Sequence, residues 1–229
     1  MIIKTFVLTA FQQNTRVVSC ETTRKAICID PGEPSQDLVD YIHENDLQLQ
    51  AIILTHGHLD HIGGTAALAR EFPDTDILLH EAEMYLYEIL PKQPLAMGFQ
   101  PHQLRDMGME YETPPTPTRF LQHSEVYEVG ELRFTVRHCP GHTLGHLVLA
   151  EMNEHKVFTG DCLFSGTIGR TDLPGGDHDR LIESIREQVL SLDDDFTVYC
   201  GHGPETTIGK ERSTNPFLTG AYQMSPGSN

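Results

Sequence analysis

The chain has 229 residues, of which 38% are hydrophobic and 21% are charged, a composition that predicts a globular domain and argues against a disordered chain. Its 33 acidic and 16 basic residues give a formal net charge of -17, which argues against a nucleic-acid backbone as the main partner. The sequence contains no apolar run of transmembrane length and no signal peptide, so we expect a cytoplasmic protein with no membrane partner.

Residues 1–90 alternate between strand-like and helical patterns. Apolar and β-branched runs predict strands over residues 2–8, 16–20, 26–29, 50–54 and 76–80. Apolar residues at helical spacing predict helices over residues 35–45, 63–72 and 81–90, and Ser35 is a suitable N-cap for the first. Residues 91–118 hold six prolines and few periodic signals, so we expect a long irregular surface loop there.

The second half of the chain resumes the alternation. Apolar runs predict strands over residues 125–127, 132–138, 146–150, 156–158 and 196–199. A helical pattern covers residues 177–190, with an aspartate near its start. The length suits one domain with a full core, which we place at residues 1–218 and follow with a flexible tail over residues 219–229.

The cysteines are scattered along the chain, and none belongs to a C-x-x-C pair. An odd number of dispersed cysteines argues against a disulfide framework. Each lies in or beside an apolar, strand-like run, which favours a buried structural role. We therefore expect five reduced and buried side chains, Cys20, Cys28, Cys139, Cys162 and Cys200.

The segment over residues 51–61 carries the strongest chemical signal. Its apolar run is followed by four side chains of the metal-binding type, His56, His58, Asp60 and His61. Alternate residues of an extended segment share a face, so His56 and His58 can point at one ion. Asp60 and His61 lie further round the turn and can reach a second ion. The spacing predicts a metal site at a strand end and leaves open whether it holds one metal or two.

Four further segments place a metal-type residue where a predicted strand ends. Each of these residues would be unremarkable alone, but clustering at five strand ends indicates a shared site. Glycines flank nearly all of them, as expected where the backbone turns sharply and approaches a site closely. The residues concerned are Asp30, His142 with His146, Asp161 and His202.

The order H-x-H-x-D-H, P-G-H-T-x-G-H, G-D and G-H-G resembles the signature of the metallo-β-lactamase fold, and the resemblance extends from about residue 2 to 218. It implies an α/β (α+β) fold, an αββα sandwich of two mixed sheets flanked by helices, with metals at one edge. It places three histidines on the first metal, His56, His58 and His142. It places on the second metal Asp60, His61 and His202, with Asp161 bridging and Asp30 orienting a ligand histidine.

Residues 160–172 look like the glyoxalase II and persulfide dioxygenase branch, and residues 206–218 resemble short, single-domain glyoxalase II-like proteins. This likeness implies hydrolysis of a small S-2-hydroxyacylglutathione, such as S-D-lactoylglutathione, to the hydroxy acid and glutathione. The expected cofactors are two divalent ions, Zn²⁺ first, with iron or manganese as alternatives, and the nucleophile is a hydroxide that bridges them. The residues expected to take part in catalysis are His58, Asp60 and Asp161.

Substrate binding is less clearly indicated than metal binding. Arg170 matches a position that is basic in glyoxalase II, and Lys210 and Arg212 are further candidates for the glutathione carboxylates. Two clamp tyrosines of that family are replaced here by Asp172 and Pro204, and its C-terminal helical domain does not follow. Asp172 would repel a carboxylate, so we expect weaker glutathione affinity or a different thioester.

Three other functions stay open from the sequence. One is a mononuclear iron persulfide dioxygenase, which would use His56, His142 and Asp161 for a single iron. The second is a lactonase or another hydrolase on the same site, and the third is a non-catalytic metal-binding protein. Metal count separates the first of these from a dinuclear hydrolase. The sequence leaves the oligomeric state open between monomer and dimer.

Overall fold

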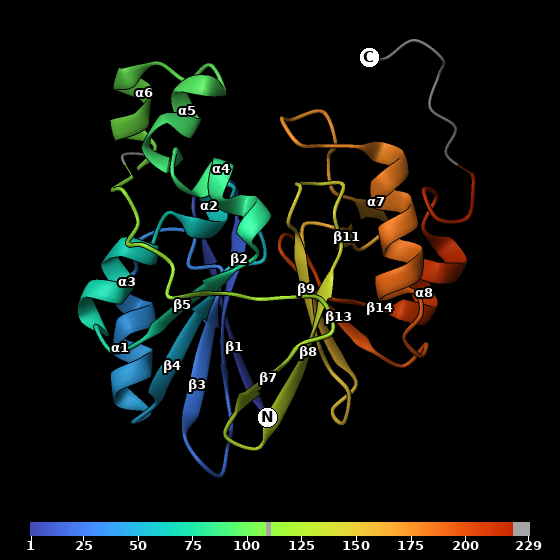
Figure 1. Ribbon diagram of the computed structural model, residues 1–229, viewed down its shortest axis with the longest axis horizontal. Helices are drawn as coiled ribbons and strands as arrows, with labels where there is room; N and C mark the ends of the chain where they lie inside the picture. Colours follow the sequence, from blue (N-terminus) through green and yellow to red (C-terminus); the bar gives the residue numbers. More distant parts are fainter. Residues whose placement is uncertain (109–110, 222–229) are drawn as a thin grey trace.

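The computed structural model describes residues 1–108 and 111–221, and its strands form two large sheets and one small hairpin (Figure 1). The first sheet has the strand order β1 (Ile2–Leu8), β2 (Gln13–Ser19), β3 (Lys25–Ile29), β4 (Gln48–Ile53), β5 (Asp76–Leu79), β6 (Arg119–Phe120). The second has the order β14 (Thr206–Thr207), β13 (Thr197–Cys200), β10 (Lys156–Gly160), β9 (Leu147–Glu151), β8 (Leu132–His138), β7 (Val126–Val129). The hairpin joins β11 (Leu163–Phe164) to β12 (Thr167–Ile168).

Both large sheets are mixed. In the first, β1, β2 and β3 pair antiparallel, whereas β3 to β6 are parallel. In the second, β10 and β13 are parallel and the other pairs are antiparallel. Figure 1 shows the sheets side by side, with α1 and α3 outside the first and α7 and α8 outside the second. The predicted αββα sandwich of two mixed sheets is confirmed.

The helices are mostly short. Those beside the first sheet are α1 (Gln36–Glu44), α2 (Leu59–Ile62) and α3 (Thr65–Glu71). Those beside the second are α7 (His178–Ser184), which continues as a π-helical turn over Ile185–Val189, and α8 (Ile208–Thr214). The segment between β5 and β6 holds the 3₁₀ turns η1 (Glu81–Glu83) and η2 (Leu90–Lys92) and the helices α4 (Met84–Tyr87), α5 (Gln93–Ala96) and α6 (Pro101–Asp106).

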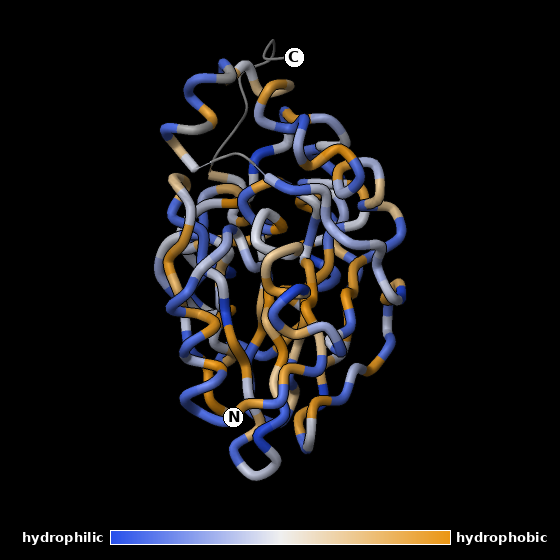
Figure 2. The backbone as a smooth tube through the Cα atoms, turned by 90° about the vertical axis from the view of Figure 1, so that its left-hand side faces the viewer, coloured by the Kyte–Doolittle hydropathy of each residue, from blue (hydrophilic) through white to orange (hydrophobic). Residues whose placement is uncertain are grey.

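Strand alternation explains how each sheet packs on both of its faces, so that the chain builds three apolar clusters, one between the sheets and one under the helices of each sheet. Ala51 and Ile53 of β4 face the second sheet, while Ile52, between them, packs under the helices of the first sheet. On β8 the buried positions Phe134 and Val136 face back across the same interior. Figure 2 shows hydrophobic stretches along the strands through the middle of the molecule. The layer between the sheets is therefore apolar, and polar side chains are left to gather at its edges.

Two expectations about secondary structure are wrong. Residues 91–118 are not irregular throughout, because η2, α5 and α6 occupy part of that segment. Pro91 and Pro94 fall in the first turn of η2 and α5, where a missing N–H costs no hydrogen bond. The helix expected over residues 81–90 is instead the two short pieces η1 and α4, and η2 begins at Leu90.

Several other expectations can be compared with the described residues. The five cysteines are buried, as predicted. No described helix has both the length and the apolarity needed to span a membrane. Of the tail expected over residues 219–229, residues 222–229 lie outside the described part of the chain, and residues 219–220 form the end of a turn.

The inter-sheet core yields a stability prediction. Phe158 is 1% exposed and packs against Phe134 and Tyr199, with ring centroids 6.2 and 5.1 Å away. Replacing Phe158 by alanine leaves a cavity that neighbouring strands cannot fill, so we expect the free energy of unfolding to fall by about 3–5 kcal/mol. Urea unfolding measures this. Val7→Ala on edge strand β1, where Val7 is 64% exposed, is the matched control and should change stability by less than about 0.5 kcal/mol.

Candidate metal centre

Loops that follow strands of both sheets supply the metal-type residues. Asp30 follows β3, and His56 to His61 follow β4, so the first sheet contributes two loops. The second sheet contributes three, with His142 between β8 and β9, Asp161 directly after β10 and His202 after β13. Residues as far apart in sequence as Asp30 and His202 thus meet at one edge of the sandwich.

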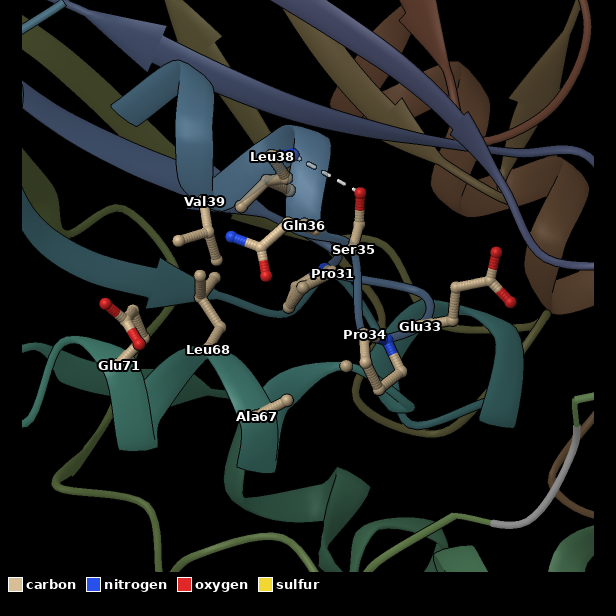
Figure 3. A pocket seen from close by; sticks show the side chains of 11 residues that line it. Pro31, Glu33, Pro34, Ser35, Gln36, Leu38, Val39, Ala67, Leu68 and Glu71 are labelled. Atoms are coloured by element: carbon tan, nitrogen blue, oxygen red, sulfur yellow. Dashed lines mark hydrogen bonds between the residues drawn. The ribbon is translucent and has the colours of Figure 1, made fainter. Parts of the chain in front are cut away.

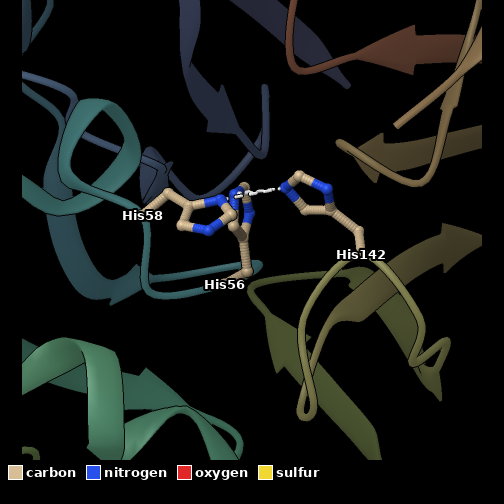
Figure 4. A group of neighbouring side chains, drawn as sticks. All are labelled: His56, His58 and His142. Carbon is tan, nitrogen blue, oxygen red and sulfur yellow. Dashed lines mark hydrogen bonds between the residues drawn. The ribbon is translucent and has the colours of Figure 1, made fainter. Parts of the chain in front are cut away.

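Three histidines form the first donor cluster (Figure 4). His58 Nδ1 lies 3.0 Å from His142 Nε2, which in turn lies 3.3 Å from His56 Nε2. Two nitrogens bound to one tetrahedral ion at about 2.0–2.1 Å are about 3.4 Å apart, so these separations fit a shared cation. Figure 4 shows the three rings converging from two loops.

Asp60, His61 and His202 form the second donor cluster. Asp60 Oδ2 lies 3.2 Å from His202 Nε2, and His61 Nε2 lies 3.3 Å from the same nitrogen. The three side chains are between 0% and 26% exposed, so water can satisfy them only in part. A second cation is therefore compatible with the chemistry of this cluster.

Asp161 lies between the two clusters. Its Oδ1 is 3.2 Å from His61 Nε2, and its Oδ2 is 3.4 Å from His202 Nε2 and 3.8 Å from His142 Nε2. The Oδ1 atom is buried and has no hydrogen-bond partner among the described residues. An orphaned buried carboxylate oxygen facing imidazole nitrogens requires a cation, either a proton or a metal ion.

Hydrogen bonds on the far side of the rings explain why Nε2 points inward. His61 Nδ1 lies 2.9 Å from Asp30 Oδ2, and Asp30 also accepts from the Thr55 backbone N–H at 2.7 Å and hydroxyl at 2.6 Å. The Thr55 hydroxyl oxygen lies 3.0 Å from His56 Nδ1. With Nδ1 as the donor, Asp30 orients His61 directly and His56 through Thr55. The sequence predicted the position of Asp30 but gave no signal for Thr55.

Backbone carbonyls orient the other two histidines that present Nε2. His142 Nδ1 lies 2.7 Å from the Arg170 carbonyl oxygen, and His202 Nδ1 lies 3.0 Å from the Phe11 carbonyl oxygen. A carbonyl can only accept, so each Nδ1 carries the proton and each Nε2 is left with its lone pair. Sequence reasoning missed both supports, because every residue has a backbone carbonyl and the identity of the side chain gives no sign that it is used.

His146 belongs to the P-G-H-T-x-G-H motif but is a donor in neither cluster, and it contacts Asp161. Its Nε2 accepts the backbone N–H of Asp161 at 3.0 Å, and its ring stacks on His56. A Cβ on Gly201 would lie 2.1 Å from Asp161 Oδ1, so only glycine permits this approach. Gly201 is thus a glycine that lets the backbone approach the site closely, as expected from the sequence.

The two clusters differ in their affinity for protons. Burial lowers the pKa of His56 and His142, and burial together with His142 lowers the pKa of His58 to about 3. Burial would also lower the pKa of His61, but Asp161, Asp60 and Asp30 outweigh it and raise that pKa well above its usual value. Despite burial, hydrogen bonds to Asp161 and Asp60 raise the pKa of His202 to about 9. The second cluster therefore holds protons where the first holds none.

A cleft of about 350 Å³ opens above both clusters. The side chains that line it are mostly apolar or belong to the clusters: Phe11, His58, Leu59, Asp60, Gln93, Met97, His142, Asp161, Phe164, Arg170, Leu173 and His202. This cleft is where a substrate can reach the donor atoms.

The structure separates the three basic residues singled out in the sequence. Arg170 lines the cleft, whereas Lys210 contacts the Ser165 hydroxyl at 3.1 Å. Arg212 donates to the carbonyl oxygens of Leu190 and Leu192, both at 2.8 Å, and so ties α8 to the segment after α7. Neither Lys210 nor Arg212 lines the cleft.

Asp172 was expected to repel a substrate carboxylate, but in the structure its charge is paired with Arg170. Its two carboxylate oxygens accept from Arg170 Nε and Nη2, both at 2.7 Å, and this contact lowers the pKa of Asp172 to about 2. Both side chains are more than half exposed, so the pair is weak and can open to another carboxylate. The basic group at the cleft is thus already neutralised by its neighbour.

A second hollow, of about 220 Å³, lies between α1 and α3 on the helical side of the first sheet (Figure 3). The lining includes Glu33 and Glu71 but no histidine or cysteine. Its Ser35 hydroxyl caps α1 by accepting from Leu38 N–H at 3.3 Å, as predicted from the sequence. This hollow lacks the donor groups that the cleft above the two clusters possesses.

An αββα sandwich with imidazole and carboxylate clusters at one sheet edge is the scaffold of a metal-dependent hydrolase. The family model described as the metallo-beta-lactamase superfamily matches residues 8–202, and the chain belongs to that superfamily. Hydroxyacylglutathione hydrolase GloC of Haemophilus influenzae is 41% identical over 212 residues, covering 92% of this chain and 95% of that protein.

Two solved structures are similar over almost the whole chain. BLEG-1, described as a B3 metallo-beta-lactamase, is 35% identical with a TM-score of 0.83, covering 95% of this chain and 100% of its own. The protein TTHA1623 in a di-iron-bound form is 36% identical with a TM-score of 0.81, covering 94% of this chain and 100% of its own.

Proton release on metal binding tests the difference between the clusters. At pH 7 an ion entering the first cluster meets neutral histidines, whereas an ion entering the second must displace a proton, because the pKa of His202 is about 9. We expect at least one proton released with the second ion, and affinity for it to fall as pH drops below about 9. Calorimetric titration with Zn²⁺ in buffers of different ionisation enthalpy measures this.

The matched control for that titration is His155→Ala, because the half-exposed His155 pairs with Asp195 and belongs to neither cluster. The number of protons released should not change in this variant. Equal proton release for both ions, or none for either, would contradict the proposed division between a neutral and a protonated cluster.

Proposed function

We propose that this protein is a metal-dependent thioester hydrolase of the glyoxalase II type, which converts an S-2-hydroxyacylglutathione to the hydroxy acid and glutathione. The observation that carries the proposal is the pair of donor clusters joined by Asp161 at the floor of the cleft. Similarity to a hydroxyacylglutathione hydrolase over nearly the full length of both chains supports the choice of substrate.

In this proposal the first ion is held by His56, His58 and His142 and the second by Asp60, His61 and His202, with Asp161 shared. When bound, two divalent ions lower the pKa of a shared water and polarise a carbonyl. We expect Zn²⁺ as the physiological metal. Iron remains a real alternative, since imidazole and carboxylate donors accept both and a 36% identical structure is described as di-iron-bound.

The chain's own groups prepare the site for an acyl transfer to water. His58, Asp60 and Asp161 are the cluster donors that line the cleft, so their charges act directly on a bound substrate. The ionic contacts of Asp60 outweigh its burial and lower its pKa, which keeps its carboxylate ionised and able to accept a hydrogen bond from water. Apolar side chains such as Phe11 and Leu173 line the cleft beside these donors and lower the local polarity, which strengthens the electrostatic contacts.

Arg170 is the group we propose to bind the carrier part of the substrate. It is the basic side chain in the lining of the cleft, and it is held by an exposed contact to Asp172. A glutathione carboxylate can replace Asp172 as the partner of the guanidinium, at the cost of breaking that contact. Because the contact to Asp172 must first break, we expect only moderate affinity for glutathione, in line with the weaker glutathione affinity expected from the sequence.

A second candidate activity is hydrolysis of a cyclic amide or ester at the same site. The observation in its favour is the 35% identical structure described as a metallo-beta-lactamase. A β-lactam or lactone needs the same water and the same polarised carbonyl, but no recognition of a peptide carboxylate. The persulfide dioxygenase alternative is less favoured, because a single iron would leave the three donors of the second cluster without a metal ion.

Turnover measured together with metal content tests the proposal. We expect the purified protein to hydrolyse S-D-lactoylglutathione with about two metal ions per chain, and Asp60→Ala to lose at least 100-fold in kcat while it keeps its fold. Activity on a β-lactam or lactone alone would favour the second candidate. One iron per chain, with oxygen uptake on glutathione persulfide and no thioester turnover, would reject the proposal.

A separate kinetic prediction concerns Arg170. In Arg170→Ala we expect KM for S-D-lactoylglutathione to rise about fivefold with little change in kcat, because an exposed ionic contact contributes about 1 kcal/mol and the backbone carbonyl that holds His142 is kept. Arg180→Ala removes an exposed arginine that pairs with Glu183 outside the cleft, and its kinetics should match the wild type. An unchanged KM in Arg170→Ala would remove this residue from substrate binding.

A further inference from the structure

Glu83 is a buried carboxylate that the proposed chemistry does not use. It is the last residue of the turn η1 and its exposed fraction is 0%. Its Oε2 accepts the backbone N–H of Gly57 at 2.7 Å, and its Oε1 accepts the backbone N–H of Gly145 at 2.5 Å. Both oxygens are therefore committed to amides of other loops.

The two amides belong to the two loops that carry the first donor cluster. Gly57 separates His56 from His58 after β4 of the first sheet, and Gly145 follows His142 in the β8–β9 loop of the second sheet. One carboxylate thus joins the loops of both sheets at the place where their histidines must lie about 3 Å apart. One backbone hydrogen bond crosses between the sheets nearby, from the Leu147 N–H to the Thr55 carbonyl oxygen at 2.7 Å, but it lies outside the segments 56–58 and 142–145 that Glu83 joins.

The glycines are the second observation that points to this contact. A Cβ on Gly57 would lie 2.8 Å from Leu86 Cβ and 3.1 Å from Glu83 Oε2. A Cβ on Gly145 would lie 3.0 Å from Glu83 Cγ and 2.9 Å from His80 Nδ1. Neither glycine has positive φ, so close approach to the Glu83 segment, and not backbone conformation, accounts for both.

Gln93 holds the same loop from the other side. Its Nε2 donates to the Gly57 carbonyl oxygen at 2.7 Å, and its Oε1 accepts the Leu59 backbone N–H at 3.0 Å. Glu83 and Gln93 therefore bind the N–H and the C=O of one residue, and that residue lies between two donor histidines. The peptide groups around Gly57 are left with little freedom to rotate.

We propose that Glu83 is a positioning residue that sets the distance between His142 and the pair His56 and His58 by holding Gly57 and Gly145. The inference rests on the proposed metal centre but not on which thioester, or other substrate, the enzyme hydrolyses. A buried carboxylate is costly unless donors compensate it, and here both donors are amides of the cluster loops. The alternative role for these two hydrogen bonds of Glu83 is purely structural: they would stabilise the fold without affecting the distances between the cluster histidines.

Glu83→Gln separates these two roles. Glutamine keeps the shape of the side chain but has one acceptor oxygen, so its amide nitrogen must face one of the two N–H donors. We expect Zn²⁺ affinity at the higher-affinity site to weaken by about 10- to 100-fold, and kcat to fall more than KM rises. Competition with a chromophoric chelator measures affinity without reference to activity, and the absorption spectrum of the Co²⁺ protein reports the ligand geometry.

Glu88→Gln is the matched control, because Glu88 is exposed on the next turn of the same segment and should leave affinity, spectrum and kcat unchanged. The inference would be overturned if a folded Glu83→Gln protein, whatever its stability, kept the Zn²⁺ affinity, the Co²⁺ spectrum and the kcat of the wild type. If that variant does not fold, Gln93→Met decides, since it releases the Gly57 carbonyl and keeps Glu83. Weaker Zn²⁺ binding in it supports the positioning of Gly57, and unchanged binding rejects it.

Failure of the proposed function would look different. A wild-type protein that binds two ions but hydrolyses no thioester would reject the substrate, while the affinity comparison between wild type and Glu83→Gln would still test the positioning role.

Discussion

The structure depends on a buried carboxylate, Asp161, that faces imidazole nitrogens from two loop clusters. Its Oδ1 has no hydrogen-bond donor among the described residues other than a proton carried by a cluster histidine. Asp30, also buried, holds the far nitrogen of His61, so negative charge lies on both sides of that ring. Such an arrangement is stable only with cations at its centre, and this requirement links the fold to metal chemistry.

The fold provides this arrangement by bringing loop ends of two sheets to one edge. The apolar layer between the sheets fixes the strands, and the residues just beyond the strand ends are then free to be polar. Glycines permit the final approach, as at Gly201 against Asp161 and at Gly57 and Gly145 against Glu83. Stability and function are therefore divided in space, with apolar side chains between the sheets and charged ones at their rim.

Apolar runs in the sequence predicted the longer strands, whereas the two-residue strands β6, β11, β12 and β14 gave no such signal. The layers and the division of the donors between two metals were expected from the resemblance of the motifs. Histidines at strand ends were recognisable because several recur with similar glycine neighbours. The short helices of residues 91–106 were missed because prolines there were taken as breakers, although Pro91 and Pro94 occupy first turns. Arg212, a candidate substrate contact in the sequence, lies within α8 and donates to backbone carbonyls outside the cleft, a partnership that the sequence pattern did not reveal.

The supports behind the cluster histidines could not be predicted for a more general reason. His142 and His202 are oriented by the carbonyl oxygens of Arg170 and Phe11, and a carbonyl leaves no trace in the amino-acid sequence. The Arg170 side chain lines the cleft while its backbone holds a cluster histidine, so substitutions there can alter substrate recognition without releasing His142. The same holds for Phe11. The metal centre and the specificity of the cleft are thus carried by different atoms of the same residues, which lets one scaffold keep its ions while its substrates differ.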